Sequence, residues 1–86
     1  MQIIYSPRAK SELDYWVKSG NKTILNKILL LVKSIIEEPY NGIGKPEPLK
    51  HNLSGCWSRR IDKEHRLVYE VDDDTKITIL SLKGHY

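Results

Sequence analysis

Residues 22–38 constrain the fold more than any other part of the sequence, because their apolar side chains recur at the spacing of a helix. The repeat consists of Ile24, Leu25, Ile28, Leu29, Leu31, Val32, Ile35 and Ile36. A stripe this broad predicts a helix, from about Lys22 to Glu38, that packs on both a second helix and a sheet. Pro39, which has no backbone N–H, ends it.

A preceding helix is predicted from about Pro7 to Ser19. Ser6 and Pro7 are typical of a helix start, because serine caps free N–H groups and proline is tolerated at the first helical position. The apolar positions again recur at helical spacing: Ala9, Leu13, Trp16 and Val17. Gly20-Asn21 supplies a stop and the next N-cap, so the two helices form a hairpin.

The rest of the chain is β-prone. A short strand, Gln2 to Tyr5, precedes the helices, and three more segments follow Gly55, separated by polar turns: Cys56 to Ile61, His65 to Val71, and Lys76 to Lys83. From Tyr40 to Gly55, glycines and prolines exclude a long regular element, although Leu49 to His51 could pair as a short strand.

These elements predict a single α+β domain over residues 1–86. A chain of this length is too short to build two independent cores. The order β-α-α-β-β-β is satisfied by a two-helix hairpin packed on one face of a small, mostly antiparallel sheet of four to five strands. The other face of that sheet then stays open.

The alternation of side chains predicts which residues lie on the open face. Leu67, Tyr69 and Val71 are the bulky apolar set of their strand and should face the helices, which leaves Arg66 pointing away. In the preceding strand, Trp57 and Ile61 share one side and Arg60 takes the other. We therefore expect Arg60 and Arg66 to share the open face, where two guanidinium groups favour an anion such as phosphate between them.

The basic charge is concentrated in one segment. Residues 45–66 hold six lysines and arginines against three carboxylates, which accounts for the whole formal charge of +3. Such a segment in an otherwise neutral protein indicates an anionic partner, most often nucleic acid. A merely solvated face is the alternative that charge alone leaves open.

The cysteine count and the length of the apolar runs indicate in which cellular compartment the protein is expected. Cys56 is the only cysteine, so no internal disulfide can form, and we expect a reducing compartment, the cytoplasm. The longest uninterrupted apolar run, Ile28 to Val32, is far too short to span a bilayer, and the N-terminus shows no signal pattern. No membrane association is predicted.

Six residues form a candidate acid-base set. They are Glu47 and Lys50 in the loop, Arg60 and Arg66 in the sheet, and His85 and Tyr86 at the C-terminus. Cleavage of RNA by its own 2'-hydroxyl needs a base, cations that stabilise the phosphorane, and an acid for the leaving oxygen. Each role has a suitable candidate here.

Glu47 would serve as the base and Arg66, with Arg60 and Lys50, as the electrostatic stabiliser. His85 would be the acid, since an ordinary histidine pKa of about 6.5 suits proton donation near neutrality. Tyr86 would stack on a base or position the substrate; a frayed terminal residue is the alternative.

Three further residues in this region are weaker candidates. His51 and Arg59 lie in the basic segment and are expected to contact the substrate, whereas His65 opens a strand and is expected to be structural or solvent-facing. Three dispersed histidines and one cysteine match no metal-ligand spacing, so we predict neither a metal nor another cofactor.

The segment Lys45 to Val71, KPEPLKHNLSGCWSRRIDKEHRLVYEV, resembles the core motif of the YoeB toxins in the RelE superfamily. The likeness extends to Tyr15-Trp16, to the Pro39–Gly42 turn and to the terminal Gly84-His85-Tyr86, so it covers the whole chain. Three departures are mild: Cys56 replaces a familiar aromatic, Tyr5 replaces a tryptophan, and Leu82-Lys83-Gly84 precedes the terminal pair.

The resemblance implies a RelE-like microbial RNase fold and the toxin of a type II toxin-antitoxin system. Such a toxin is a metal-independent endoribonuclease, an mRNA interferase, that enters the ribosomal A site, cuts the bound mRNA and inhibits translation. Glu47 is then the base, Lys50, Arg60 and Arg66 contact phosphate, His85 is the acid and Tyr86 orients the substrate.

The resemblance also implies partners. These are mRNA, the ribosome with its rRNA, and a YefM-type antitoxin through which alone operator DNA is bound; a homodimer is left open. The antitoxin segment needs an apolar groove, and the stripe from Ile24 to Ile36 is a candidate for part of it. Two other functions remain as alternatives: a non-cleaving ribosome binder that blocks translation, and a DNA-binding corepressor.

Overall fold

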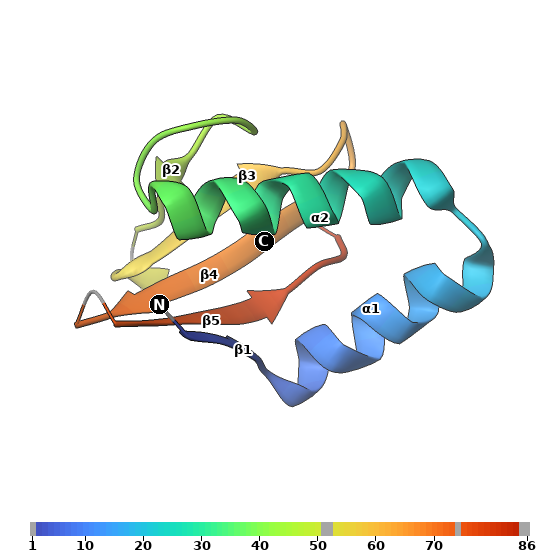
Figure 1. The fold of residues 1–86 in the computed structure, drawn as a ribbon, viewed down its shortest axis with the longest axis horizontal. Helices are drawn as coiled ribbons and strands as arrows, with labels where there is room; N and C mark the ends of the chain where they lie inside the picture. The colour runs from blue at the N-terminus through green and yellow to red at the C-terminus, as the bar shows by residue number, and fades with distance from the viewer. Residues whose placement is uncertain (1, 51–52, 74, 85–86) are drawn as a thin grey trace.

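The computed structural model describes residues 2–50, 53–73 and 75–84 and contains two helices and five strands. Figure 1 shows α2 lying across the sheet, with α1 beside its β1–β5 side. In chain order the elements are β1 (Gln2–Tyr5), α1 (Pro7–Ser19), α2 (Lys22–Glu37), β2 (Glu47–Pro48), β3 (Cys56–Arg60), β4 (Arg66–Asp72) and β5 (Lys76–Ser81). The predicted α+β class and element order are confirmed.

Both helices begin and end where the sequence indicates. The Ser6 side chain accepts from the Ala9 N–H at 3.0 Å, and Asn21 Oδ1 accepts from the Ile24 N–H at 3.1 Å. Gly20 ends α1 with a left-handed φ of +73°. Helix α2 ends at Glu37, one residue before the predicted boundary, since the residue before a proline favours extended backbone.

The sheet is mixed, with strand order β1-β5-β4-β3-β2. Strand β1 pairs with β5 in parallel, and the remaining neighbours are antiparallel. The short strand considered at Leu49–His51 lies earlier, at Glu47 and Pro48, although the Leu49 N–H still donates to the Cys56 carbonyl at 2.9 Å. His51 lies outside the described residues. Proline is tolerated at position 48 because β2 is an edge strand, so its missing N–H faces no neighbour.

The core lies between the helices and one face of the sheet. Helix α2 contributes Ile24, Ile28, Leu31 and Ile35, all nearly inaccessible to solvent. They pack in one cluster with Leu67 and Tyr69 of β4, and Val71 packs against the same cluster. The predicted inward face of this strand is confirmed.

Part of the apolar stripe of α2 remains uncovered. Leu29, Leu30 and Ile36 are 64%, 55% and 43% exposed, although the sheet covers the opposite side of the helix. A hollow of about 430 Å³ opens between the two helices and is lined by Leu13, Val17, Lys22, Leu25, Asn26 and Leu29. The stripe is therefore wider than the intramolecular contact requires.

The C-terminal strand is shorter than predicted. Strand β5 ends at Ser81 rather than Lys83, because the Leu82 N–H donates to Glu12 Oε1 of α1 at 2.7 Å. The Leu82 carbonyl accepts from Trp16 Nε1 at 3.0 Å. After Ser81 the backbone therefore bonds to side chains of α1 instead of to a neighbouring strand.

Among the described residues, neither helix has the length and apolar composition that a membrane span requires.

Gly44 is required where the loop passes over α2. Its φ is +81°, and a Cβ built there would lie 2.5 Å from Leu31 Cδ2 and 3.1 Å from Arg59 Cβ. We expect Gly44→Ala to lower the free energy of unfolding by about 2–4 kcal/mol, through left-handed strain and overpacking. Urea denaturation would measure this.

Gly20→Ala is the matched control for Gly44→Ala. Gly20 has a similar φ of +73°, but nothing lies within 4 Å of an added Cβ. It should therefore show the cost of backbone strain alone, about 1–2 kcal/mol. Equal losses in the two variants would contradict the packing argument for Gly44.

Candidate active site

Arg60 and Arg66 lie directly opposite each other at the ends of β3 and β4. Directly opposed residues have Cβ atoms about 5 Å apart and point to the same face of the sheet. Arg66 Nη1 donates to the carbonyls of Asp62 at 2.9 Å and His65 at 3.2 Å, whereas Arg60 is exposed. The expected pairing of two arginines is therefore present, with one of them held by the backbone.

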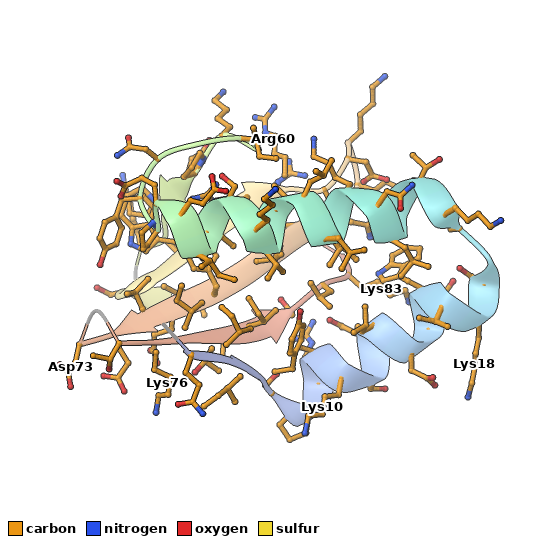
Figure 2. The ribbon with its side chains drawn as sticks, in the orientation of Figure 1. Lys10, Lys18, Arg60, Asp73, Lys76 and Lys83 are labelled. Atoms are coloured by element: carbon orange, nitrogen blue, oxygen red, sulfur yellow. The ribbon has the colours of Figure 1, made fainter. Side chains whose placement is uncertain are left out.

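Basic side chains from three segments converge around this pair. A hollow of about 460 Å³ is lined by Lys27, Gly44, Lys45, Arg60, Ile61, Asp62, Lys63 and Arg66. We call it the basic hollow. Its five cations face one carboxylate, which is the electrostatic arrangement that favours a phosphate group. In Figure 2, Arg60 lies on the other side of α2 from Lys10, Lys18 and Lys76.

Among the described residues that line the basic hollow, Asp62 supplies the one negative charge. Desolvation acts to raise its pKa, but the backbone N–H groups of His65 and Glu64, which donate to Oδ1 at 2.7 and 2.8 Å, lower it. The carboxylate is thus used to close the β3–β4 turn. It therefore stays ionised near neutrality beside the arginines.

Lys27 is a component that sequence reasoning missed. It lies on α2, more than 30 residues from the arginine pair, yet it lines the same hollow. Lysines also occur at other positions of this amphipathic helix, so the local sequence does not distinguish Lys27. Only the packing of α2 on the sheet places it there.

Glu47 lies on the same sheet face as the two arginines. It pairs with Ser58, which pairs in turn with Val68, and Ser58 is two residues from Arg60 along β3. Because side chains two apart share a face, these residues lie on one surface. Glu47 is exposed, as is Lys50 just beyond β2. Three of the six residues in the candidate acid-base set, Glu47, Arg60 and Arg66, are thereby placed on the open face.

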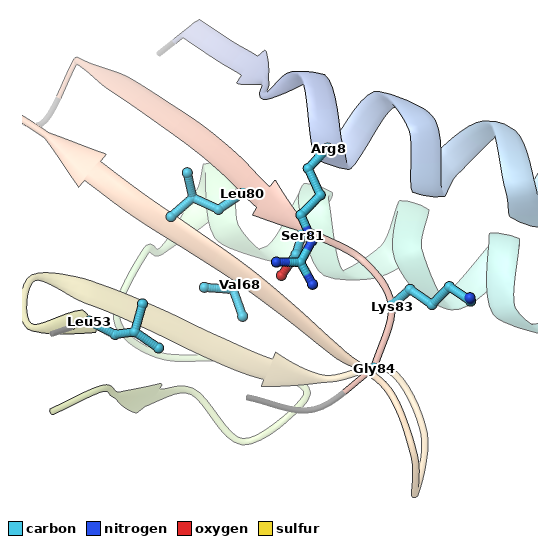
Figure 3. Close-up of a pocket in the computed structure, with 7 residues that line it drawn as sticks. All are labelled: Arg8, Leu53, Val68, Leu80, Ser81, Lys83 and Gly84. Carbon is cyan, nitrogen blue, oxygen red and sulfur yellow. The ribbon is translucent and has the colours of Figure 1, made fainter. Parts of the chain in front are cut away.

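The middle of the open face is hollowed beside this row. Figure 3 shows the hollow, about 180 Å³, lined by Arg8, Leu53, Val68, Leu80, Ser81, Lys83 and Gly84. Its floor is aliphatic, and Arg8 and Ser81 lie at its rim, whereas the Lys83 ammonium lies over the Tyr15 ring. A dry apolar cavity of about 150 Å³ holds a benzene ring, so this hollow is of the order needed for one planar ring.

Cys56 lies on the open face but is only 7% exposed. Burial raises the pKa of its thiol, and the charge of Glu70, its cross-strand neighbour, raises it further. The thiol therefore stays protonated at neutral pH. A protonated buried thiol is a poor nucleophile, so Cys56 packs and takes no part in the chemistry.

The described chain ends at Gly84, beside Arg66. The Gly84 carbonyl accepts from the Arg66 N–H at 3.1 Å, and the Gly84 N–H donates to His65 Nδ1 at 2.9 Å. His85 and Tyr86 follow directly in sequence but lie outside the described residues, as does His51. Their proposed roles stay predictions.

Arg59 was wrongly expected to contact the substrate. Its side chain is completely buried on the helix-facing side of β3. It donates to Tyr69 Oη, Ser34 Oγ and the carbonyls of Glu38, Asn41 and Ile43 at 2.7–3.2 Å. The sequence alternation that turned Arg60 outward turns Arg59 inward. No donor geometry is left for a phosphate, and Arg59 instead holds the turn after α2.

Comparison with known proteins identifies the family. The sequence model described as the YoeB-like toxin of bacterial type II toxin-antitoxin systems matches residues 5–86. The chain belongs to this family. The YoeB toxin of Escherichia coli K12 is 49% identical over 86 residues, covering 100% of both chains. The family resemblance stated from the sequence is confirmed.

Two solved structures show the same fold. A YoeB/ParE toxin from Agrobacterium tumefaciens, 32% identical, superposes with a TM-score of 0.95 and covers 100% of both chains. YoeB from Staphylococcus aureus, solved in a heterotetrameric YoeB-YefM complex, is 48% identical to this chain. It superposes with a TM-score of 0.87, and the match covers 100% of this chain and 98% of that one. The same toxin has also been solved as a dimer, with a TM-score of 0.89.

Proposed function

We propose that this YoeB-like toxin is a ribosome-dependent endoribonuclease that cuts mRNA in the A site and thereby inhibits translation. The observation that carries the proposal is the arrangement on the open face of the sheet. An exposed carboxylate, Glu47, shares that face with the opposed Arg60 and Arg66. The two arginines also line the basic hollow, to which α2, the loop before β2 and the β3–β4 turn add Lys27, Lys45 and Lys63. A base beside a phosphate-binding cluster is what cleavage of RNA by its own 2'-hydroxyl requires.

In the proposed reaction, Glu47 takes the proton from the 2'-hydroxyl as its oxygen bonds to phosphorus. The bond from phosphorus to the 5'-oxygen breaks, and His85 donates a proton to that oxygen. The products are a 2',3'-cyclic phosphate and a free 5'-hydroxyl. Arg66, Arg60 and Lys50 stabilise the additional negative charge on the phosphorane. No step calls for a metal ion, and metal independence stays a prediction.

Two geometric features support these roles. Arg66 is held by two backbone carbonyls, so its guanidinium is positioned before substrate arrives. The described chain ends at Gly84, hydrogen-bonded to the backbone N–H of Arg66. The next residue in sequence, His85, therefore begins one peptide bond from a residue that contacts this arginine.

The hollow in Figure 3 supports a single-stranded substrate. It lies on the same face as Glu47, and its aliphatic floor with Arg8 at the rim suits one base of the bound mRNA. Exposed bases are the parts of an RNA that proteins read most readily. Tyr86 is proposed to orient the same substrate.

A YefM-type antitoxin is the proposed inhibitor. The S. aureus relative is seen in a heterotetramer with YefM. Here the hollow between α1 and α2, together with exposed Leu29 and Leu30, offers an apolar surface for a segment that folds on binding. Operator DNA would then be bound through the antitoxin. A homodimer of this chain remains a prediction.

The proposal is tested by primer-extension mapping of a defined mRNA in a reconstituted translation system. Wild type, a variant lacking residues 85–86, and wild type without ribosomes are compared. We expect cuts within the A-site codon only when both the ribosome and the two terminal residues are present. Translation arrest with intact mRNA would instead favour the non-cleaving ribosome binder.

A further inference from the structure

The last described residues are held away from the sheet by side chains from two distant parts of the chain. Glu12 Oε1 accepts from the Leu82 N–H at 2.7 Å, and Trp16 Nε1 donates to the Leu82 carbonyl at 3.0 Å. Both backbone groups of one residue are therefore fixed by α1. Lys83 adds a weaker contact, with its ammonium 4.3 Å from the centre of the Tyr15 ring.

His65 fixes the next peptide group. Its Nδ1 accepts from the Gly84 N–H at 2.9 Å, while the Gly84 carbonyl accepts from the Arg66 N–H at 3.1 Å. Gly84 thus has both of its backbone groups bonded to two consecutive residues at the start of β4. We call Glu12, Trp16 and His65, with their bonds to Leu82 and Gly84, the C-terminal anchor.

The His65 ring is itself held in place. It packs edge-to-face on Trp16, with ring centroids 4.8 Å apart, and its side chain is only 15% exposed. Because Nδ1 accepts a hydrogen bond, the ring proton is on Nε2, which faces the Glu64 carboxylate at 3.8 Å. One imidazole therefore connects helix α1, strand β4 and the end of the chain.

We infer that His65 is a positioning residue for catalysis, acting through the Gly84 N–H on the terminal pair His85-Tyr86. This inference rests on the proposed function, in which those two residues serve as acid and substrate guide. Leaving the tail unanchored would let it sample many conformations, and a misplacement of about 1 Å can reduce a catalytic rate by about 100-fold. The anchor restricts the residue next to the proposed acid before substrate binds.

Two substitutions separate the hydrogen bond from the packing. His65→Phe keeps a ring against Trp16 but puts a carbon in place of Nδ1. His65→Asn loses the ring but places an amide oxygen at the position of Nδ1, where it can accept from the Gly84 N–H. A purely structural role would favour Phe over Asn, whereas a positioning role favours Asn.

The first measurement is amide hydrogen exchange of Gly84 by NMR, which needs no ribosome. In wild type we expect this amide to exchange at least about 10-fold more slowly than in an unfolded chain. The protection should be lost in His65→Phe and largely restored in His65→Asn. Free exchange of the Gly84 amide in wild type would overturn the anchor, whether or not either variant folds.

The second measurement is single-turnover cleavage of ribosome-bound mRNA. We expect His65→Phe to lower the rate at saturating enzyme by about 10- to 100-fold, with little change in the half-saturating concentration, and His65→Asn to recover most of it. In a variant that lacks residues 85–86, His65→Phe should have little additional effect, because the residues it positions are already gone.

The two proposals fail in different ways. If wild type does not cut mRNA on the ribosome, the proposed function fails, while the Gly84 exchange data still test the anchor. If wild type cuts and His65→Phe cuts equally fast, or if the effect of His65→Phe on residual cutting persists undiminished without residues 85–86, the positioning role of His65 is overturned. The nuclease assignment would then stand without it.

Discussion

Replacing Glu47 with alanine is expected to slow single-turnover cleavage of ribosome-bound mRNA by about 100-fold or more, as loss of a general base does. Glu47 is exposed at the edge strand β2, and its side chain shares the sheet face with Arg60 and Arg66. Among the described residues, Asp62 is the one carboxylate that lines the basic hollow, and its Oδ1 is used by two backbone N–H groups.

Glu37→Ala is the matched control for Glu47→Ala. Glu37 is an exposed carboxylate at the end of α2, so its removal changes net charge equally but not the open face. We expect Glu37→Ala to cut at close to the wild-type rate.

His85→Ala should slow the rate by a similar factor of about 100, as loss of a general acid does. Wild-type rates in both Glu47→Ala and His85→Ala would refute the proposed acid-base pair.

Replacing Arg59 with methionine is expected to lower the free energy of unfolding by about 3–5 kcal/mol. Methionine keeps much of the volume but donates no hydrogen bond. The carbonyls of Glu38, Asn41 and Ile43 would then lose a charged donor, and Ser34 and Tyr69 would lose a partner. Chemical denaturation followed by circular dichroism measures the loss.

Arg60→Met is the neighbouring control. Arg60 is exposed and follows Arg59 directly, so its replacement should change stability by less than about 0.5 kcal/mol. The two variants should separate stability from function: Arg60→Met keeps its stability but cuts slowly, whereas Arg59→Met loses stability. Equal stability losses at the two positions would contradict the buried role of Arg59.

Arg59 also stabilises the segment that forms part of the basic hollow. Its guanidinium holds the turn formed by residues 38–43, and the next residue, Gly44, accepts from the Arg60 N–H at 2.7 Å. Lys45, which lines the basic hollow, follows directly. The buried arginine therefore keeps one wall of the phosphate-binding region in place without contacting substrate.

Local patterns in the sequence determined the secondary structure and the faces of its elements. Ser6, Gly20 and Asn21 set the helix ends, and the alternation in 56–71 placed Arg60 and Arg66 on one open face. These predictions rest on interactions between residues a few positions apart, whose geometry is the same in any fold. The resemblance of residues 45–71 added the family, which the comparisons confirmed.

Only the tertiary structure decided the contacts between distant segments. Four such contacts join residues far apart in sequence. Strand β1 pairs in parallel with β5, Lys27 lines the basic hollow, Arg59 is buried among five acceptors, and Leu82 and Gly84 are anchored. Such contacts depend on how helices dock on the sheet, which periodicity does not encode. From the sequence alone, a charged residue such as Arg59 is expected to be exposed. Only the packed structure shows that carbonyl groups surround it.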